Sequence, residues 1–181
     1  MPTLFQQDYY RKTGKIETGL FFKSFFDPGL RFLYFFRKAQ KHDPKSVPGI
    51  FYRILLRRYQ IKYGFQISAK TEIGGGLYLG HWGAVVVNQS ARIGKNCNLA
   101  HGVTIGQTNR GDKQGVPSIG DDVWIGANSV IVGGITIGNN VLIAPNSYVT
   151  ADVPDNSIVV GNPAKMMTSE NATDGYINNR I

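Results

Sequence analysis

At 181 residues, with 42% of them hydrophobic, the chain is long enough for one domain with a buried core, and its composition excludes a disordered chain despite 22 glycines. No run reaches the roughly 18 apolar residues of a membrane span. The chain also lacks a signal-peptide pattern, and its single cysteine excludes an intrachain disulfide, so we expect a cytoplasmic protein. The net charge of +8 divides into +9 over residues 1–62 and −1 over residues 63–181.

The basic region 1–62 is predicted to form two to four short helices and holds 14 of the 21 aromatic residues. Asp27-Pro28-Gly29 and Val47-Pro48-Gly49 mark turns or helix starts. Basic, aromatic-rich amphipathic helices favour contact with an anionic membrane, which would place the protein at the inner face of the membrane. The alternative is a cap on the open end of the next domain. Nucleic-acid binding is disfavoured because the aromatic residues lie in apolar blocks such as LYFF, not as spaced stacking platforms.

Over residues 63–167 an aliphatic residue returns every six positions, usually followed by a small residue that would let the backbone turn a corner. This period fits neither a helix nor an ordinary strand, and it is typical of a β-helix built from hexapeptide repeats. We therefore predict a mainly β fold, a left-handed parallel β-helix of about five triangular coils. Cys97 occupies a small, inward-facing position, which favours a structural role over a reactive thiol. The aliphatic positions are Ile67, Ile73, Leu79, Ile93, Leu99, Ile105, Ile119, Ile125, Ile131, Ile137, Ile143 and Val149.

Two interruptions break this period. Leu79 and Ile93 are 14 residues apart where 12 are expected, so two extra residues fall around GAVVVNQ. Ile105 and Ile119 are 14 residues apart where six are expected, so eight residues leave the coil as the loop QTNRGDKQGVPS. Polar loops that interrupt a regular scaffold often carry function, although a neutral insertion is the alternative.

With these insertions allowed for, one side of the β-helix carries a column of residues in consecutive coils. Each lies two positions after an aliphatic residue of the repeat. Spacing alone therefore predicts that two of the three histidines lie one coil apart on the same face. The column consists of His81, His101, Ala127 and Pro145.

The segments IGGGLYLGHWGAVVVNQSARIGKNCNLAHGVTIGQT, PSIGDDVWIGANSVIVGGITIGNNVLIAPNSYV and VVGNPAKM closely resemble the serine acetyltransferase family. More narrowly, they resemble the short serine-acetyltransferase-like proteins of capsule and polysaccharide biosynthesis. The resemblance covers roughly residues 64–168; LGHWGAVVV is specific for the subgroup and GNPAK for acyltransferases of this fold. It implies an acetyl-CoA-dependent O-acetyltransferase that works as a homotrimer, with its sites between subunits and without a metal.

In that family a histidine at the position of His81 is the general base. A hydroxyl is a poor nucleophile until a base with a pKa near neutrality takes its proton. The oxygen then attacks the thioester of acetyl-CoA, nearby polar donors stabilise the oxyanion, and the CoA thiolate leaves. The alternative for His81 is a surface histidine at a corner of the coil.

The chain departs from the family pattern at residues that serve the serine acceptor. The aspartate that orients the catalytic histidine falls at Gln66, and a neighbouring histidine falls at Ser68. On the inserted loop, a second active-site histidine falls at Val116 and an arginine at Gly115.

His101 stands where the family has a glutamine. It either orients His81, contacts the acceptor or is an incidental substitution on the same face. Asn88 and Asp112 are further candidates to orient His81 and to bind the acceptor.

The CoA site implied by the resemblance is a groove between subunits, lined largely by backbone groups. Lys113 and Lys165 are candidates to pair with CoA phosphates, unless each is only a solvated charge. Pro145 has no N–H, so a backbone donor expected there is absent. The positions implied for CoA are Gln107, Thr108, Lys113, Gly126, Ala127, Pro145 and Lys165.

We therefore predict O-acetylation of a hydroxyl on a sugar or polysaccharide precursor, with L-serine acetylation in cysteine biosynthesis as the runner-up. Two alternatives come from other classes: a non-catalytic β-helical scaffold and a γ-carbonic-anhydrase-like metal enzyme. The latter needs three histidines at a subunit interface, and only His81 and His101 fall on the predicted β-helix. The polar tail, residues 168–181, is expected to be frayed.

Overall fold

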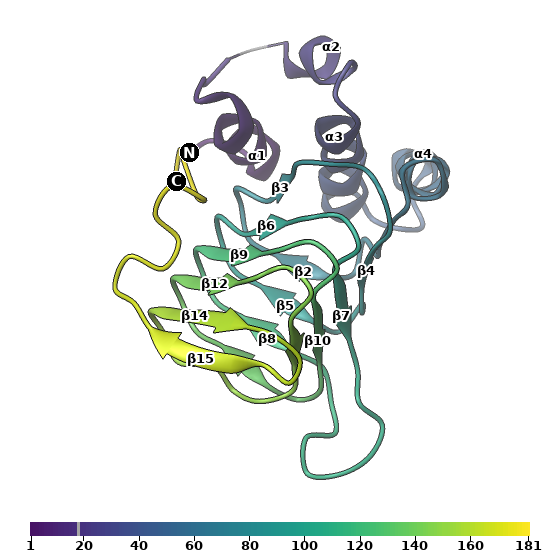
Figure 1. The fold of residues 1–181 in the computed structure, drawn as a ribbon. Helices are drawn as coiled ribbons and strands as arrows, with labels where there is room; N and C mark the ends of the chain where they lie inside the picture. The colour runs from purple at the N-terminus through teal and green to yellow at the C-terminus, as the bar shows by residue number, and fades with distance from the viewer. Residues whose placement is uncertain (18) are drawn as a thin grey trace.

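The computed structural model describes residues 1–17 and 19–181 and shows four helices at one end of a triangular parallel β-helix (Figure 1). Stacked strands give the β-helix about five left-handed coils, so the predicted fold is confirmed. None of the helices in the described part of the chain combines the length and apolarity needed to cross a bilayer. The helices are α1 (Leu4–Thr13), α2 (Leu20–Ser24), α3 (Pro28–Lys41) and α4 (Val47–Tyr63).

Both proline-glycine segments of the N-terminal region start helices. Asp27 precedes α3, and its carboxylate accepts a hydrogen bond of 2.8 Å from the N–H of Leu30. Ser46 precedes α4 in the same way, and its hydroxyl accepts a bond of 3.1 Å from the N–H of Gly49. Proline is tolerated in the first turn because its missing N–H would have had no partner within the helix.

Each side of the triangular β-helix is one parallel sheet. The first side consists of β1 (Phe65–Ile67), β4 (Val85–Val87), β7 (Thr104–Gly106), β10 (Val130–Val132) and β13 (Tyr148–Val149). The second side consists of β2 (Glu72–Ile73), β5 (Arg92–Ile93), β8 (Ser118–Ile119) and β11 (Thr136–Ile137). The third side consists of β3 (Tyr78–Leu79), β6 (Asn98–Leu99), β9 (Val123–Ile125), β12 (Val141–Ile143) and β14 (Ser157–Val160), with β15 (Lys165–Thr168) added antiparallel.

All twelve predicted aliphatic positions point into the core, and none is more than 6% exposed. The small residue after them has a different purpose from the one we expected. A Cβ at Gly94 would lie 2.5 Å from the carbonyl oxygen of Gly120 in the next coil, so glycine permits close stacking there. The left-handed backbone conformation is adopted instead by residues such as Asn96 and Asn128, because asparagine tolerates a positive φ.

Strand register shows where the two extra residues of the first interruption lie. Phe65 pairs with Val85 and Ile67 with Val87, so this coil has 20 residues instead of 18. The insertion therefore precedes β4 and widens the corner at residues 80–84, slightly upstream of the segment GAVVVNQ where we placed it. This wide corner, between the third and first sides, contains His81.

The helices cover the open end of the first coil, as the capping alternative predicted. The ring of Phe32 on α3 lies 5.0 Å from that of Phe65 on β1, and both are buried. The buried Arg37 forms a bidentate pair with Asp8 of α1 and donates to the carbonyl of Ile73 at 2.7 Å. Helices and coils thus share one hydrophobic core.

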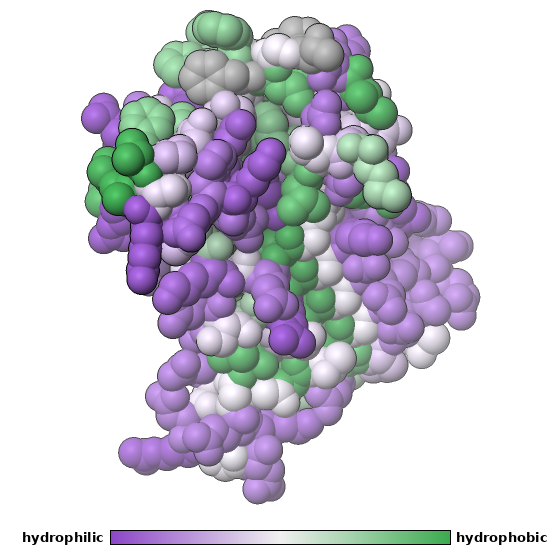
Figure 2. Space-filling model, turned by 180° about the vertical axis from the view of Figure 1, so that it is seen from behind, coloured by the Kyte–Doolittle hydropathy of each residue, from purple (hydrophilic) through white to green (hydrophobic). Residues whose placement is uncertain are grey.

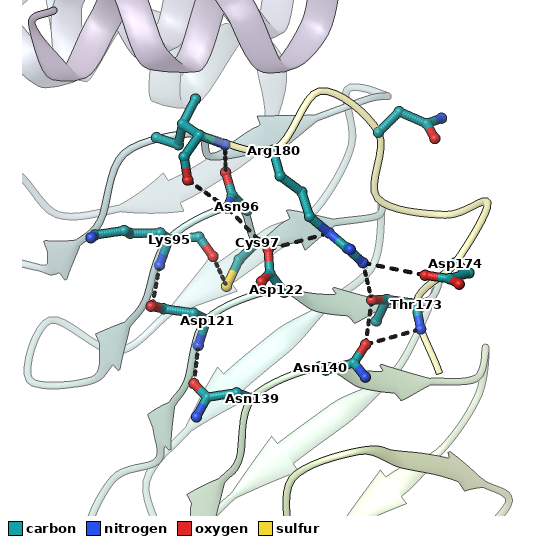
Figure 3. Close-up of polar contacts among 12 residues, drawn as sticks. Lys95, Asn96, Cys97, Asp121, Asp122, Asn139, Asn140, Thr173, Asp174 and Arg180 are labelled. Atoms are coloured by element: carbon teal, nitrogen blue, oxygen red, sulfur yellow. Dashed lines mark hydrogen bonds and ion pairs between the residues drawn. The ribbon is translucent and has the colours of Figure 1, made fainter. Parts of the chain in front are cut away.

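The C-terminal tail is not frayed, so that expectation was wrong. After β15 the chain returns along the β-helix, and the two termini lie close together (Figure 1). Ala172, Thr173 and Ile177 are buried, and Arg180 pairs with Asp122 at 3.6 Å (Figure 3). Polar residues stacked at one corner of the coils hold the tail. Their side chains form hydrogen bonds with tail groups that would otherwise bond to water. Asn140, for example, accepts a bond of 2.7 Å from the Thr173 hydroxyl.

Candidate active site

His81 and His101 lie together on the corner between the third and first sides. Leu79 pairs in register with Leu99, so residues two positions further on are stacked one coil apart. The two imidazole rings have centroids 5.9 Å apart and an interplanar angle of 87°, and both side chains are exposed. The adjacency predicted from spacing is therefore confirmed.

Neither imidazole has a hydrogen-bond partner within residues 1–17 and 19–181. Asn88 does not approach His81: its amide donates to the Gln107 side chain at 3.1 Å, and its oxygen accepts from the N–H of Ser90. Gln66, at the position of the family's aspartate, lines a separate hollow beside α4. A single chain thus presents two exposed imidazoles without an orienting carboxylate, an arrangement able to take a proton from a bound hydroxyl.

Trp82 is a candidate site residue that the sequence reasoning missed. Its indole is 67% exposed directly beside His81. The neighbouring Gly83 has a φ of 142° and donates its N–H to the carbonyl of Tyr63 at the end of α4. A signal for it existed in the sequence, because an aromatic residue between glycine-rich turns at a coil corner cannot reach the core.

Part of the predicted CoA-binding set shares the corner with the histidines. Register places Ala127 and Pro145 below His101, and the N–H of Asn128 donates to the carbonyl of His101 at 3.0 Å. Gly126, beside them, is buried. Lys165 is exposed and pairs with Val160, where β14 reaches this corner.

The other predicted positions lie on the inserted loop, at the opposite edge of the first side. Thr108 and Gly115 close the loop through two backbone hydrogen bonds of 3.0 Å. Lys113 is not an unpaired solvated charge, because its ammonium lies 2.5 Å from the Asp152 carboxylate. The hydrogen bond from Lys113 lowers the pKa of Asp152. Asp112 is exposed. The candidate residues thus form two groups, one on the histidine corner and one on the loop.

A hollow larger than the one beside Gln66 lies elsewhere. A cavity of about 870 Å³ opens between α1, α3 and the second side. Tyr34, Lys38 and Ile93 are among its lining residues, and none of the predicted site residues reaches it. Since His81 and His101 are both exposed, a site at their corner is a surface site in the single chain.

Comparison with known proteins agrees with this fold. Residues 117–151 match the family described as Bacterial transferase hexapeptide (six repeats). The chain is 42% identical over 118 residues to the Putative colanic acid biosynthesis acetyltransferase WcaB of Escherichia coli (strain K12), covering 65% of this chain and 70% of that protein. The chain belongs to the serine acetyltransferase-like hexapeptide-repeat family.

The chain spans only part of the length of several serine acetyltransferases that it matches. It is 39% identical over 105 residues to Serine acetyltransferase 2 of Arabidopsis thaliana, but this covers 58% of the chain and only 32% of that enzyme. The serine acetyltransferase of Neisseria gonorrhoeae in complex with serine has a TM-score of 0.70 at 32% identity, over 92% of this chain and 66% of that one. The Brucella abortus enzyme in complex with coenzyme A has a TM-score of 0.72 at 28% identity, over 92% and 66%.

Proposed function

We propose that the chain is an acetyl-CoA-dependent O-acetyltransferase with His81 as the general base. The observation that carries this proposal is the pair of exposed imidazoles on the widened corner. Neither ring makes a hydrogen bond to the residues that the structure describes, and both are exposed, so they are accessible to a substrate hydroxyl. Family membership supports the reaction class, since the relatives it matches are described as acetyltransferases.

In the proposed reaction His81 accepts the proton of the acceptor hydroxyl as the oxygen attacks the acetyl carbonyl. A tetrahedral oxyanion forms, and it collapses as the thiolate of CoA leaves. The proton on His81 then passes to the departing sulfur or to solvent. No bond between enzyme and acetyl group is required.

The donor is proposed to be acetyl-CoA, because a serine acetyltransferase of this fold has been solved with coenzyme A. Its site would lie along the histidine corner, where Gly126, Ala127 and Pro145 present mostly backbone and small side chains. The exposed Lys165 at the end of this corner is a suitable partner for a CoA phosphate.

A homotrimer would complete the site. The histidine corner and the inserted loop are at opposite edges of the first side, separated by six residues from His101 to Gln107, roughly 20 Å of extended chain at most. Gln107, Thr108 and Lys113 thus lie across the first side from the histidine corner of their own chain. In a closed three-fold ring, the loop of one subunit meets the corner of the next, and Asp112 then becomes a candidate to orient the neighbour's His81.

The acceptor is proposed to be a sugar hydroxyl of a polysaccharide precursor. WcaB, described as a colanic acid biosynthesis acetyltransferase, matches over 70% of its length. The exposed indole of Trp82 beside His81 offers an apolar face to the C–H groups of a sugar ring. Residues that serve serine in the family are replaced by Gln66, Ser68 and Val116. L-Serine remains the second candidate, because one of the structural relatives was solved with serine.

A thiol-release assay with acetyl-CoA against L-serine and a panel of sugars tests both candidates. We expect turnover of a sugar and its loss, by about a hundredfold or more, in His81→Ala. Efficient turnover of L-serine would contradict the proposed acceptor, and unchanged turnover in His81→Ala would contradict the proposed base. If no acceptor is acetylated and CoA does not bind, the non-catalytic scaffold is the better interpretation.

A further inference from the structure

The outward face of α4 is apolar. Its exposed hydrophobic side chains recur at spacings of three and four residues, which places them along one face of the helix. Figure 2, in which α4 lies at the left edge, shows hydrophobic side chains gathered there beside hydrophilic ones. These residues are between 48% and 83% exposed: Val47, Ile50, Phe51, Ile54 and Ile61.

The same helix is positively charged, and it has no acidic residue of its own to balance the charge. It carries four Lys/Arg residues and no Asp or Glu. Arg57, Arg58 and Lys62 are exposed, and none of the three has an ion-pair partner in the part of the chain that the structure describes. With a helical repeat of about 100° per residue, Arg58 falls within the apolar face, and Arg57 and Lys62 fall at its two margins.

Apolar side chains bordered by cations match one kind of surface particularly well. Aliphatic groups insert between lipid acyl chains, while arginine and lysine extend to anionic phosphates at the boundary. A second copy of α4 would instead bring like charges together, since the region 1–62 carries a net charge of +9. We propose that this face of α4 docks the protein onto an anionic membrane surface.

Docking through α4 would also bring the histidine corner towards the bilayer. The carbonyl of Tyr63, the last residue of α4, accepts the N–H of Gly83 at 2.9 Å, and the carbonyl of Gly64 accepts the N–H of Val85 at 3.0 Å. The exposed Trp82 lies in this connection, and tryptophan favours the level of the lipid headgroups. An acceptor carried on a lipid would then reach His81 from the membrane; this last step rests on the proposed acetyl transfer, whereas membrane docking does not.

Co-sedimentation of the full chain with vesicles tests the docking. We expect binding to mixed phosphatidylcholine–phosphatidylglycerol vesicles that weakens as salt is added, and little binding to phosphatidylcholine alone. Ile54→Glu is expected to weaken the binding by about tenfold or more, because it places a charge in the inserted face. Ile61→Glu provides a second variant on the same face, and circular dichroism checks that each variant is folded.

Met167→Glu is the matched control, since Met167 is 56% exposed on β15, far along the chain from the helices. It should bind vesicles as the unmodified chain does. Equal binding to neutral and anionic vesicles, or unchanged binding by both α4 variants, would overturn the proposal. A loss of oligomeric mass in Ile54→Glu without loss of vesicle binding would assign the face to contacts between subunits. Acetyl transfer to a soluble acceptor, measured in parallel, should be unaffected by Ile54→Glu.

Discussion

At the scale of single residues, the histidine pair determines what the corner can do. The T-shaped contact leaves both imidazoles accessible, and the first interruption of the repeat gives His81 a wider corner than its neighbour has. His81 is proposed to act on the acceptor directly. His101, one coil below, contacts it and is proposed to orient it.

His101→Ala should lower kcat by about tenfold and leave KM nearly unchanged, because His81 would lose the neighbouring ring that contacts it and helps to orient it. Steady-state kinetics that separate kcat from KM check this. His101→Gln, which restores the residue type of the resembling family, should recover part of the rate. An unaltered kcat in His101→Ala would make His101 an incidental residue.

Cys97 should resist alkylation in the folded protein. Burial raises the pKa of its thiol to about 12, so at pH 8 roughly one thiol in ten thousand is ionised. We expect iodoacetamide to label the urea-unfolded chain rapidly and the native chain only as it unfolds, as mass spectrometry would show. Fast labelling under native conditions would contradict the structural role of this residue.

At the scale of elements, one buried ion pair joins the helices to the first coil. Asp8 is fully buried, pairs with Arg37 and accepts the N–H of Leu77 at 2.9 Å. Arg37 in turn donates to the backbone of β2. Together the two side chains connect α1, α3 and the β-helix, so the cap depends on hydrogen bonds as well as on its aromatic core.

Asp8→Ala should therefore lower the free energy of unfolding by about 3–5 kcal/mol, because it leaves the guanidinium of Arg37 buried without its partner. Urea titration followed by circular dichroism measures the change. The matched control is Glu72→Ala, which removes a pair with Arg92 whose side chains are both 71% exposed. This control should cost no more than about 1 kcal/mol. Equal effects of the two substitutions would contradict the role assigned to Asp8.

At the scale of the whole molecule, the candidate site residues form two separate groups. The histidine corner and the inserted loop are at opposite edges of the first side, and the proposed association of subunits would bring them together. Closed three-fold symmetry achieves this while giving every subunit the same environment.

Mixed trimers test the division. One chain would carry His81→Ala, and the other would have residues 109–114 replaced by Asn-Gly, a turn that suits the paired Thr108 and Gly115. Each variant alone should be inactive, whereas co-expression should restore roughly a quarter of the sites, those that combine an intact corner with an intact loop from different chains. No recovery in verified mixed trimers would show that each site lies within one chain.

The sequence by itself determined the scaffold. An aliphatic residue every six positions has only one efficient way to be buried, so Ile67 through Val149 could be assigned to the core, and two histidines 20 residues apart could be stacked on one face. The helix starts at Pro28 and Val47 were equally local, because they depend on capping groups a few residues away.

Other features were decided only by tertiary structure. The tail looked frayed because its partners, such as Asp122 and Asn140, are distant in sequence and become adjacent only when the coils stack. Lys113 looked free until the loop folded towards Asp152, 39 residues further on. The sequence could not show that the apolar face of α4 points outward. A periodic pattern shows that a helix has an apolar face, but only packing decides whether that face contacts the core or is exposed.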